Sequence, residues 1–373
     1  MIPLNDILNE LRAAPRLSGT PACDVIARRL AGRFEDIGYN PEIQEYTFIG
    51  WRVPEPPIVT NLDTGRELPA RAVTWCGGIE GVDVEGVIAP RGKMNSWGLG
   101  TVREYGRWAI VDNDIDHRNV YLIEDTGAHL VLPYPMEDVA YICLAQSDLK
   151  HLADTSARVR VSTRTELSFG AKGLNVVATK QGRSSDEIII GAHHDTVYDD
   201  ENGLHDNGGG CATLLLLAEL LRDIDTHHTI RFLSTGGEEF NLVGARSYIR
   251  QREEEESLRH VKASITLDYI TQPPEVVFVR CTEDFDPIIN RVLDAHRGKE
   301  YGYDLEDGIY RDLGCIDGRA FEEKGISSIY FAPTGYPQRH DEDNESIARN
   351  LRTNAMFVRD LIIRTDQEMG FQQ

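Results

Sequence analysis

The chain of 373 residues is poor in basic side chains, with seven lysines and 39 Lys and Arg in total against 61 Asp and Glu. Its formal net charge is therefore −22 at pH 7. Because nucleic acids and anionic membranes are bound by clustered Lys and Arg, we expect neither of them as a partner. The charge is compatible with attracting cations, either metal ions or substrates that carry an amine, although a solubilising surface explains it better at this point.

Long apolar runs and paired cysteines are also missing. The longest near-apolar run, 211–218, is far shorter than the roughly 20 residues that cross a bilayer. The six cysteines are scattered, with no C-x-x-C pair, which disfavours a disulfide framework. Residues 1–15 contain no basic segment followed by an apolar stretch. We predict a cytoplasmic protein, with secretion as the alternative if a leader has been removed.

The pattern of the sequence divides the chain into two kinds of region. Short β-like runs between Gly, Pro and Asp clusters predict a small β-rich unit over 49–164. After residue 173, strand-like segments alternate with helical ones, which predicts right-handed crossovers and a largely parallel, doubly wound α/β sheet. We therefore expect an α/β domain formed by 1–48 and 165–373. Residues 4–11 and 22–37 are predicted helices. After residue 173 the predicted strands are 187–192, 229–234, 263–267 and 326–331, and the predicted helices are 209–223, 243–256, 285–296 and a last one whose inward face holds Ile347, Leu351, Ala355, Val358 and Ile362.

Histidine and acidic side chains follow the ends of four predicted strands, and one more lies in a Gly-rich turn. Open α/β sheets bind ligands at the carboxyl ends of their strands, so these side chains are expected to converge. The alternative is that these acidic residues only form a solvated rim on the protein surface. That alternative explains neither the presence of the histidines nor the order in which the residues occur along the chain. The residues are His193, Asp195, Asp206 in the turn 205–210, Glu238, Glu239, Asp268 and His340.

The residue types in this set point to metal chemistry. Two histidines with several carboxylates form a ligand set suited to Zn²⁺. One carboxylate can bridge two ions about 3.5–4 Å apart, and another that binds no metal can take a proton from water. The adjacent Glu238 and Glu239 fit that division into a base and a ligand.

Several segments together resemble the M28 family of zinc peptidases. The resemblance covers nearly all of 1–48 and 165–373. It implies a three-layer α/β/α, phosphorylase/hydrolase-like fold and, for most members, a dinuclear aminopeptidase. The segments are RLSGTPAC (16–23), GAHHDTV (191–197), HDNGGG (205–210), STGGEEFNLVGARSYI (234–249), SITLDYI (264–270), CIDGRAF (315–321) and RHDEDNES (339–346).

The resemblance also implies a site with two zinc ions per chain. His193 and Asp268 would hold one ion, while Glu239 and His340 would hold the other. Asp206 would bridge them, and the bond that follows it matches a position that is cis in the family.

Catalytic roles follow from the same resemblance. Glu238 would be the general base, and Asp195 would orient the first histidine. Leu313 stands where some members have a tyrosine that steadies the oxyanion, and Tyr310 is the nearest substitute. The family's CSDH-like stretch is Cys-Ile-Asp-Gly here (315–318), so a familiar histidine is missing. This departure puts the substrate class in doubt.

Other functions remain open at this point. The leading expectation is an enzyme that releases N-terminal residues from peptides. The alternatives are an amidohydrolase of small N-acyl amino acids, a glutaminyl-cyclase-like enzyme with one zinc, and a non-catalytic binding protein. Residues 105–114, 123–132 and 139–152 resemble a protease-associated domain, which typically shapes substrate access, although an unrelated β-rich decoration is the alternative. The sequence indicates no oligomeric state.

Overall fold

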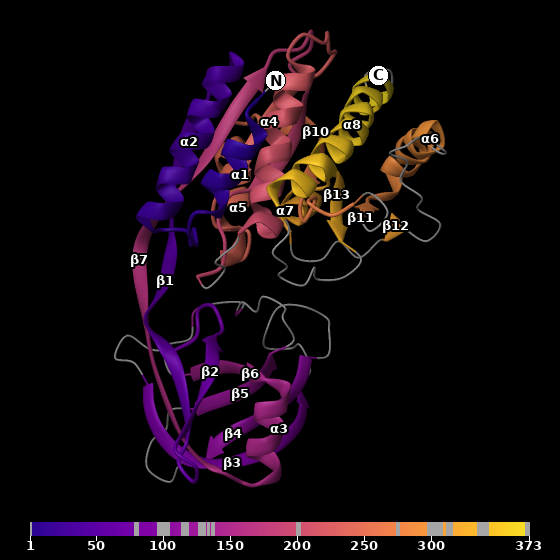
Figure 1. Ribbon diagram of the computed structural model, residues 1–373. Coiled ribbons are helices and arrows are strands. Elements are labelled where there is room, and N and C mark those ends of the chain that lie inside the picture. The colour runs from indigo at the N-terminus through magenta and orange to yellow at the C-terminus, as the bar shows by residue number, and fades with distance from the viewer. Residues whose placement is uncertain are drawn as a thin grey trace. The chain divides into compact units, whose positions relative to one another are not determined.

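The computed structural model describes residues 2–77, 82–94, 105–112, 119–125, 132, 135, 139–198, 203–273, 277–296, 309–310, 316–333 and 343–369. The chain forms two compact units, one of Met1–Tyr46 with Lys172–Gln373 and the other of Thr47–Ala171. Two long strands link them, since β1 (Glu42–Asn61) leaves the larger unit and β7 (Arg158–Lys180) returns to it (Figure 1).

The larger unit is built on a mixed sheet with the strand order β7-β9-β8-β10-β13-β11-β12. The central strands β9, β8, β10 and β13 are parallel to one another, whereas β7 runs antiparallel to β9 and β11 antiparallel to β13. The predicted α/β class with a mostly parallel sheet is therefore confirmed. The strands that follow β7 are β8 (Glu187–His193), β9 (Thr229–Thr235), β10 (Val261–Leu267), β11 (Val277–Cys281), β12 (Ile309–Tyr310) and β13 (Ser327–Pro333).

Helices cover both faces of this sheet and give three layers (Figure 1). Neighbouring side chains of one strand face opposite layers, so Ile188 and Ile190 join one core while Ile189 joins the other. The first core is covered by α1 (Leu4–Arg12), α2 (Pro21–Ile37), α4 (Gly209–Leu221), α6 (Asp286–His296) and α8 (Asn344–Met369). The second is covered by α5 (Val243–Glu254) and α7 (Asp317–Glu322).

The apolar run 211–218 forms the middle of α4, where every residue is buried. A helix that is apolar all round must be covered on all sides, and α4 packs against β8, α2 and α8. Among the described residues, no helix has the length and apolar character that crossing a membrane requires.

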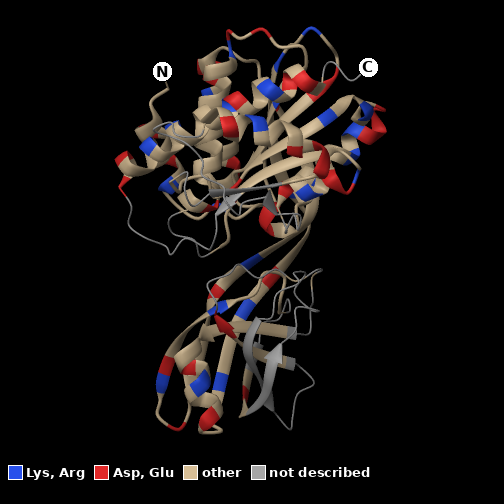
Figure 2. Ribbon diagram, turned by 90° about the vertical axis from the view of Figure 1, so that its right-hand side faces the viewer, with Lys and Arg blue, Asp and Glu red and all other residues tan. Residues whose placement is uncertain are grey.

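The described part of the smaller unit is β-rich and contains one α-helix. Its strand order is β1-β2-β6-β5-β4-β3-β7, and β1 and β7 also pair with each other. Buried side chains such as Val120, Ile142 and Val161 form its interior. Its remaining elements are β2 (Arg66–Ala72), β3 (Val82–Met94), β4 (Tyr105–Asp112), β5 (Asn119–Asp125), β6 (Val139–Ala145) and α3 (Gln146–Asp154). Acidic and basic residues are distributed over the helices and strands of both units (Figure 2).

Candidate metal centre

The carboxyl ends of three adjacent parallel strands bring four of the predicted residues together. His193 is the last residue of β8, and Asp268 follows the last residue of β10. Glu238 and Glu239 lie in a single helical turn, Glu238–Phe240, shortly after β9. All four side chains are buried, with exposed fractions of 9% or less.

Asp206 joins them from the turn Leu204–Gly208, which leads into α4. The side chain of Asn207 holds this turn, since its Nδ2 donates to the carbonyl of Leu267 at 2.7 Å and its Oδ1 accepts from the backbone N–H of Gly210 at 3.0 Å. The Asp206–Asn207 peptide bond is cis. Because Leu267 ends β10, the turn is tied directly to the strand that precedes Asp268.

The side chain of His193 is at the centre of the group. Its Nε2 lies 3.1 Å from Oδ1 of Asp206 and 3.6 Å from Oδ1 of Asp268. Potential ligand atoms of His193, Asp206 and Glu239 all lie within 4.8 Å of one another, and so do those of His193, Glu238 and Asp268. Five of the predicted residues thus form two overlapping clusters that share one imidazole.

Asp195 contacts the cluster on the Nδ1 side of the His193 imidazole. Nδ1 of His193 lies 3.2 Å from the carbonyl oxygen of Asp195 and 3.5 Å from its Oδ1. The Asp195 carboxylate also accepts hydrogen bonds from the backbone N–H groups of Glu238 and Glu239, at 3.2 and 3.3 Å. One buried carboxylate therefore contacts both the imidazole and the turn that carries the two glutamates.

Burial and crowding of like charges dominate the electrostatics of the site. Burial raises the pKa of Glu238 and of Glu239 well above their usual values, and the charges of neighbouring carboxylates add to the effect. Burial, reinforced by the charge of Asp206, raises the pKa of Asp268 to about 6. Burial alone would lower the pKa of His193, but the charge of Glu238 and contacts with three aspartates raise it well above its usual value. The arrangement is therefore one that a bound cation would stabilise.

The donor atoms fit a zinc ion. Nε2 of His193 and Oδ1 of Asp268 are buried, and among the described residues neither atom makes a hydrogen bond of good geometry, since their contacts at 3.1 and 3.6 Å are with other members of the cluster. Imidazole nitrogen and carboxylate oxygen are ligands that Zn²⁺ accepts, and buried polar atoms rarely remain without a partner. Nδ1 of His193 is occupied by Asp195, which leaves Nε2 as the nitrogen directed at the cluster.

Two predicted site residues cannot be placed in the cluster. His340 lies outside the described residues. The backbone of Tyr310 belongs to β12, which pairs with β11 at the far end of the sheet from β7, but its side chain lies outside the description. Their roles stay predictions.

The structure adds residues that sequence reasoning did not single out. The hydroxyl of Tyr269 donates to Oδ2 of Asp206 at 2.5 Å. The hydroxyl oxygen of Ser18 accepts a hydrogen bond from the backbone N–H of Gly237 at 2.7 Å, just before the two glutamates. Asp317 is buried at the start of α7, where burial raises its pKa to about 7. Ser18 and Asp317 lie within the family-like segments 16–23 and 315–321, which was the available signal for them.

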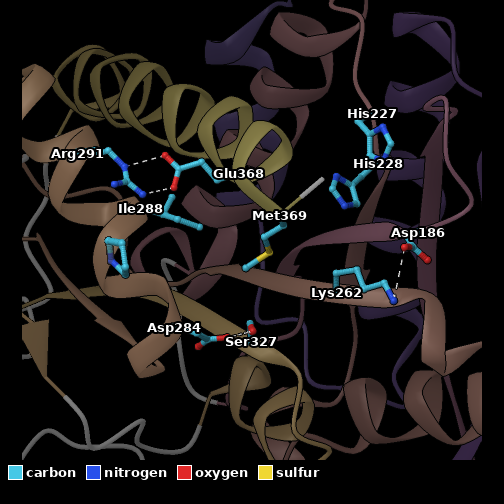
Figure 3. A pocket seen from close by; sticks show the side chains of 11 residues that line it. Asp186, His227, His228, Lys262, Asp284, Ile288, Arg291, Ser327, Glu368 and Met369 are labelled. Carbon is cyan, nitrogen blue, oxygen red and sulfur yellow. Dashed lines mark hydrogen bonds and ion pairs between the residues drawn. The ribbon is translucent and has the colours of Figure 1, made fainter. Parts of the chain in front are cut away.

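A cavity of about 310 Å³ lies at the opposite ends of the strands, next to Asp186 before β8 and Lys262 near the start of β10 (Figure 3). Four of its charged side chains form two pairs, Lys262 with Asp186 at 3.5 Å and Arg291 with Glu368 at 2.8 Å. Since His193 lies at the other end of β8, this cavity is separate from the carboxylate cluster.

The sheet and the cluster define an α/β protein with a carboxylate- and histidine-lined cluster at its strand ends that could hold a metal ion. The model of peptidase family M28 matches residues 175–362, which include all five clustered residues. Probable leucine aminopeptidase 2 of Trichophyton verrucosum (strain HKI 0517) is 27% identical over 230 residues, which is 61% of this chain and 42% of that protein. The chain thus spans less than half the length of this curated relative.

Solved structures show the same fold. The peptidase M28 precursor of Shewanella amazonensis SB2B has a TM-score of 0.70 at 16% identity, over 97% of this chain and 92% of that one. BSAP, a zinc aminopeptidase from Bacillus subtilis, has a TM-score of 0.63 at 18% identity, over 95% of this chain and 94% of that one. With the family model matching half of its length, this chain belongs to peptidase family M28.

Proposed function

We propose that the chain is a zinc-dependent aminopeptidase that binds two zinc ions and releases N-terminal residues from peptides. The observation that carries the proposal is the convergence of His193, Glu238, Glu239 and Asp268, all buried, with the partly exposed Asp206 at the strand ends of an M28 family member. The names of the leucine aminopeptidase and zinc aminopeptidase relatives support the activity and the metal. The net charge of −22 suits a substrate with a free amino group.

The metal ligands in this proposal are those implied by the sequence. His193 and Asp268 would hold one ion, Glu239 and His340 the other, and Asp206 both. Bound zinc would supply a Lewis acid that polarises the substrate carbonyl and makes a coordinated water more acidic.

The other residues would act on protons and orientation. Glu238 would take a proton from the attacking water and transfer it to the leaving amine. Asp195 would keep the imidazole of His193 oriented through its contact at Nδ1. Tyr310 would steady the oxygen of the substrate carbonyl. The unit of residues 49–164, proposed to be protease-associated-like, would shape substrate access. The cytoplasmic location stays a prediction.

Glu238→Gln tests the proton transfer, because glutamine keeps the size of the side chain and cannot accept the proton. Zinc content should stay near that of the wild type, while turnover of aminoacyl substrates should fall by at least the 10²–10⁴-fold that general base catalysis contributes. The control is Glu254→Gln, which removes an exposed carboxylate on α5. Near-normal activity in Glu238→Gln would contradict the assignment.

A substrate screen with zinc content measured in parallel tests the activity class. Aminoacyl substrates, N-acyl amino acids and dipeptides are offered to the same preparation. About two zinc ions per chain with cleavage of aminoacyl substrates supports the proposal. One ion would favour a cyclase-like reaction, and cleavage of N-acyl amino acids alone would favour an amidohydrolase. Metal binding without turnover of any substrate would indicate a binding protein.

A further inference from the structure

The turn that carries Asp206 lies against the residues that follow β10. Nδ2 of Asn207 donates to the carbonyl of Leu267 at 2.7 Å. On the other side of Asp206, Nδ1 of His205 lies 2.5 Å from the hydroxyl oxygen of Thr271. The backbone before and after the aspartate is therefore fixed along the chain that leaves β10.

One contact between these segments reaches the carboxylate itself. The hydroxyl of Tyr269 donates to Oδ2 of Asp206 at 2.5 Å, while Oδ1 faces Nε2 of His193 at 3.1 Å. The two oxygens consequently have different neighbours. A carboxylate with one oxygen held by a phenol hydroxyl is restricted in its rotation about the last side-chain bond, so the direction of Oδ1 is set by Tyr269.

The backbone at Tyr269 has φ of +48°, in the left-handed region that residues with large side chains rarely adopt. The following turn is held by α8, because Nδ2 of Asn354 donates to the carbonyls of Ile270 and Gln272 at 2.7 and 2.9 Å. The surrounding fold thus imposes a conformation that Tyr269 alone would not favour. Conformations of this kind, held by surrounding structure, are concentrated at functional sites.

We propose that Tyr269 is a positioning residue that fixes the carboxylate of Asp206 for metal binding, an inference that rests on the proposed zinc site. A carboxylate offers about four lone-pair positions, so Oδ2 accepts the hydroxyl and retains a position for an ion. Loss of an outer hydrogen-bond partner of a metal ligand typically weakens metal affinity 10–100-fold. We expect a loss of this size when the hydroxyl is removed.

Tyr269→Phe removes the hydroxyl and keeps the ring. The matched control is Tyr248→Phe, because the hydroxyl of Tyr248 on α5 is buried and has no hydrogen-bond partner among the described residues. The zinc dissociation constant is measured on the full-length apo protein by competition with a chromogenic chelator. The stability of each apo form is measured by urea unfolding in EDTA, and the visible spectrum of each Co²⁺-loaded form reports ligand geometry.

Tyr269→Phe is expected to bind zinc 10–100-fold more weakly, with apo stability equal to that of the control and altered Co²⁺ bands. Tyr248→Phe is expected to match the wild type in zinc affinity and in spectrum. A zinc affinity of Tyr269→Phe within twofold of the wild type would overturn the inference. A loss of affinity that parallels a loss of apo stability would assign a structural role and would overturn it as well.

The same measurements separate this inference from the proposed function. If the wild type binds zinc and cleaves aminoacyl substrates while Tyr269→Phe binds zinc equally well, the inference fails alone. If the wild type binds no zinc, the proposed function fails, and the inference fails with it.

Discussion

Replacing Arg16 by Met should strongly destabilise the larger unit, because this buried cation joins three separate segments of the chain. The side chain of Arg16 is 1% exposed. Its Nε donates to the carbonyl of His194 and its Nη2 to that of Gly203, both at 2.8 Å, and its Nη1 donates to the carbonyl of Leu11. Two of these carbonyls belong to the segments that carry His193 and precede Asp206, so the guanidinium supports the approach to the metal centre.

The size of the effect follows from these three bonds. A hydrogen bond that involves a charged group contributes about 1.5–3 kcal/mol, so the three together contribute about 4.5–9 kcal/mol. Methionine fills most of the volume but removes one donor from each of the three carbonyls, of which that of Gly203 still accepts the backbone N–H of Gly208 at 2.9 Å. Removing the guanidinium also removes the cost of burying its charge, which offsets part of the loss. We expect the free energy of unfolding to fall by about 3–5 kcal/mol.

Urea unfolding of the apo protein in EDTA, followed by far-ultraviolet circular dichroism, measures this loss without a contribution from bound metal. Arg16→Lys should recover only a minor part of it, because all three donors of lysine lie on one atom and cannot reach three separate carbonyls. Arg29→Met, an exposed change on α2, should alter stability by less than about 0.5 kcal/mol. A loss below about 1 kcal/mol for Arg16→Met, or full recovery by lysine, would refute the reasoning.

Three further outcomes are expected. Gly203→Ala should lower the free energy of unfolding by about 1–3 kcal/mol in the same urea assay. The reason is that φ at Gly203 is +54° and an added Cβ would lie 2.4 Å from Nη1 of Arg16. A free energy of unfolding equal to that of the wild type would contradict this prediction. Although burial alone raises the pKa of Asp366, hydrogen bonds from His228 and His227 lower it overall. Its carboxylate therefore stabilises the fold above its unfolded-state pKa of about 3.9, and the contribution is lost as the pH falls through the lower folded-state value. Asp366→Asn should thus cost about 1–3 kcal/mol at pH 7 and progressively less below about pH 4, whereas a loss that does not depend on pH would contradict the assignment. Removal of metal by EDTA should lower the melting temperature, since an ion at 1,000 times its dissociation constant stabilises a protein by about 4.1 kcal/mol; an unchanged melting temperature would count against a metal site.

The order of strands and helices in the larger unit could be predicted because each element leaves a periodic pattern. The predicted helix 209–223 is α4 at Gly209–Leu221, and the predicted strand 187–192 is β8 at Glu187–His193. The strands β7 and β11 were not predicted. Their antiparallel directions could not have been inferred from pattern alone, because a buried apolar strand has the same pattern beside a parallel or an antiparallel neighbour. The strand β7 also has no single periodic pattern along its length, because its burial alternates in the first half and is continuous over part of the second half.

The clustered residues could be predicted because the chemistry and the topology agree. His193, the glutamates and Asp268 each follow a strand that the sequence itself indicates, and parallel strands end at one edge. Tyr269 and Arg16 lie within the family-like segments 264–270 and 16–23, but their roles were not assigned from the sequence, since these roles arise from contacts with segments distant in sequence. An acidic residue at a helix start, such as Asp317, is ordinarily explained by the helix dipole, so its burial near the centre was not foreseen.

Two kinds of support around the proposed metal site should therefore respond differently to substitution. Arg16 and Asn354 donate to backbone carbonyls and fix the path of the strand-end segments, whether or not metal is bound. Tyr269 and Asp195 instead contact the proposed ligands themselves, at the carboxylate of Asp206 and at the imidazole of His193. Changes of the first kind should appear mainly in the stability of the apo protein. Changes of the second kind should appear mainly in metal affinity, because the orientation of a ligand contributes little to folding until an ion occupies the site.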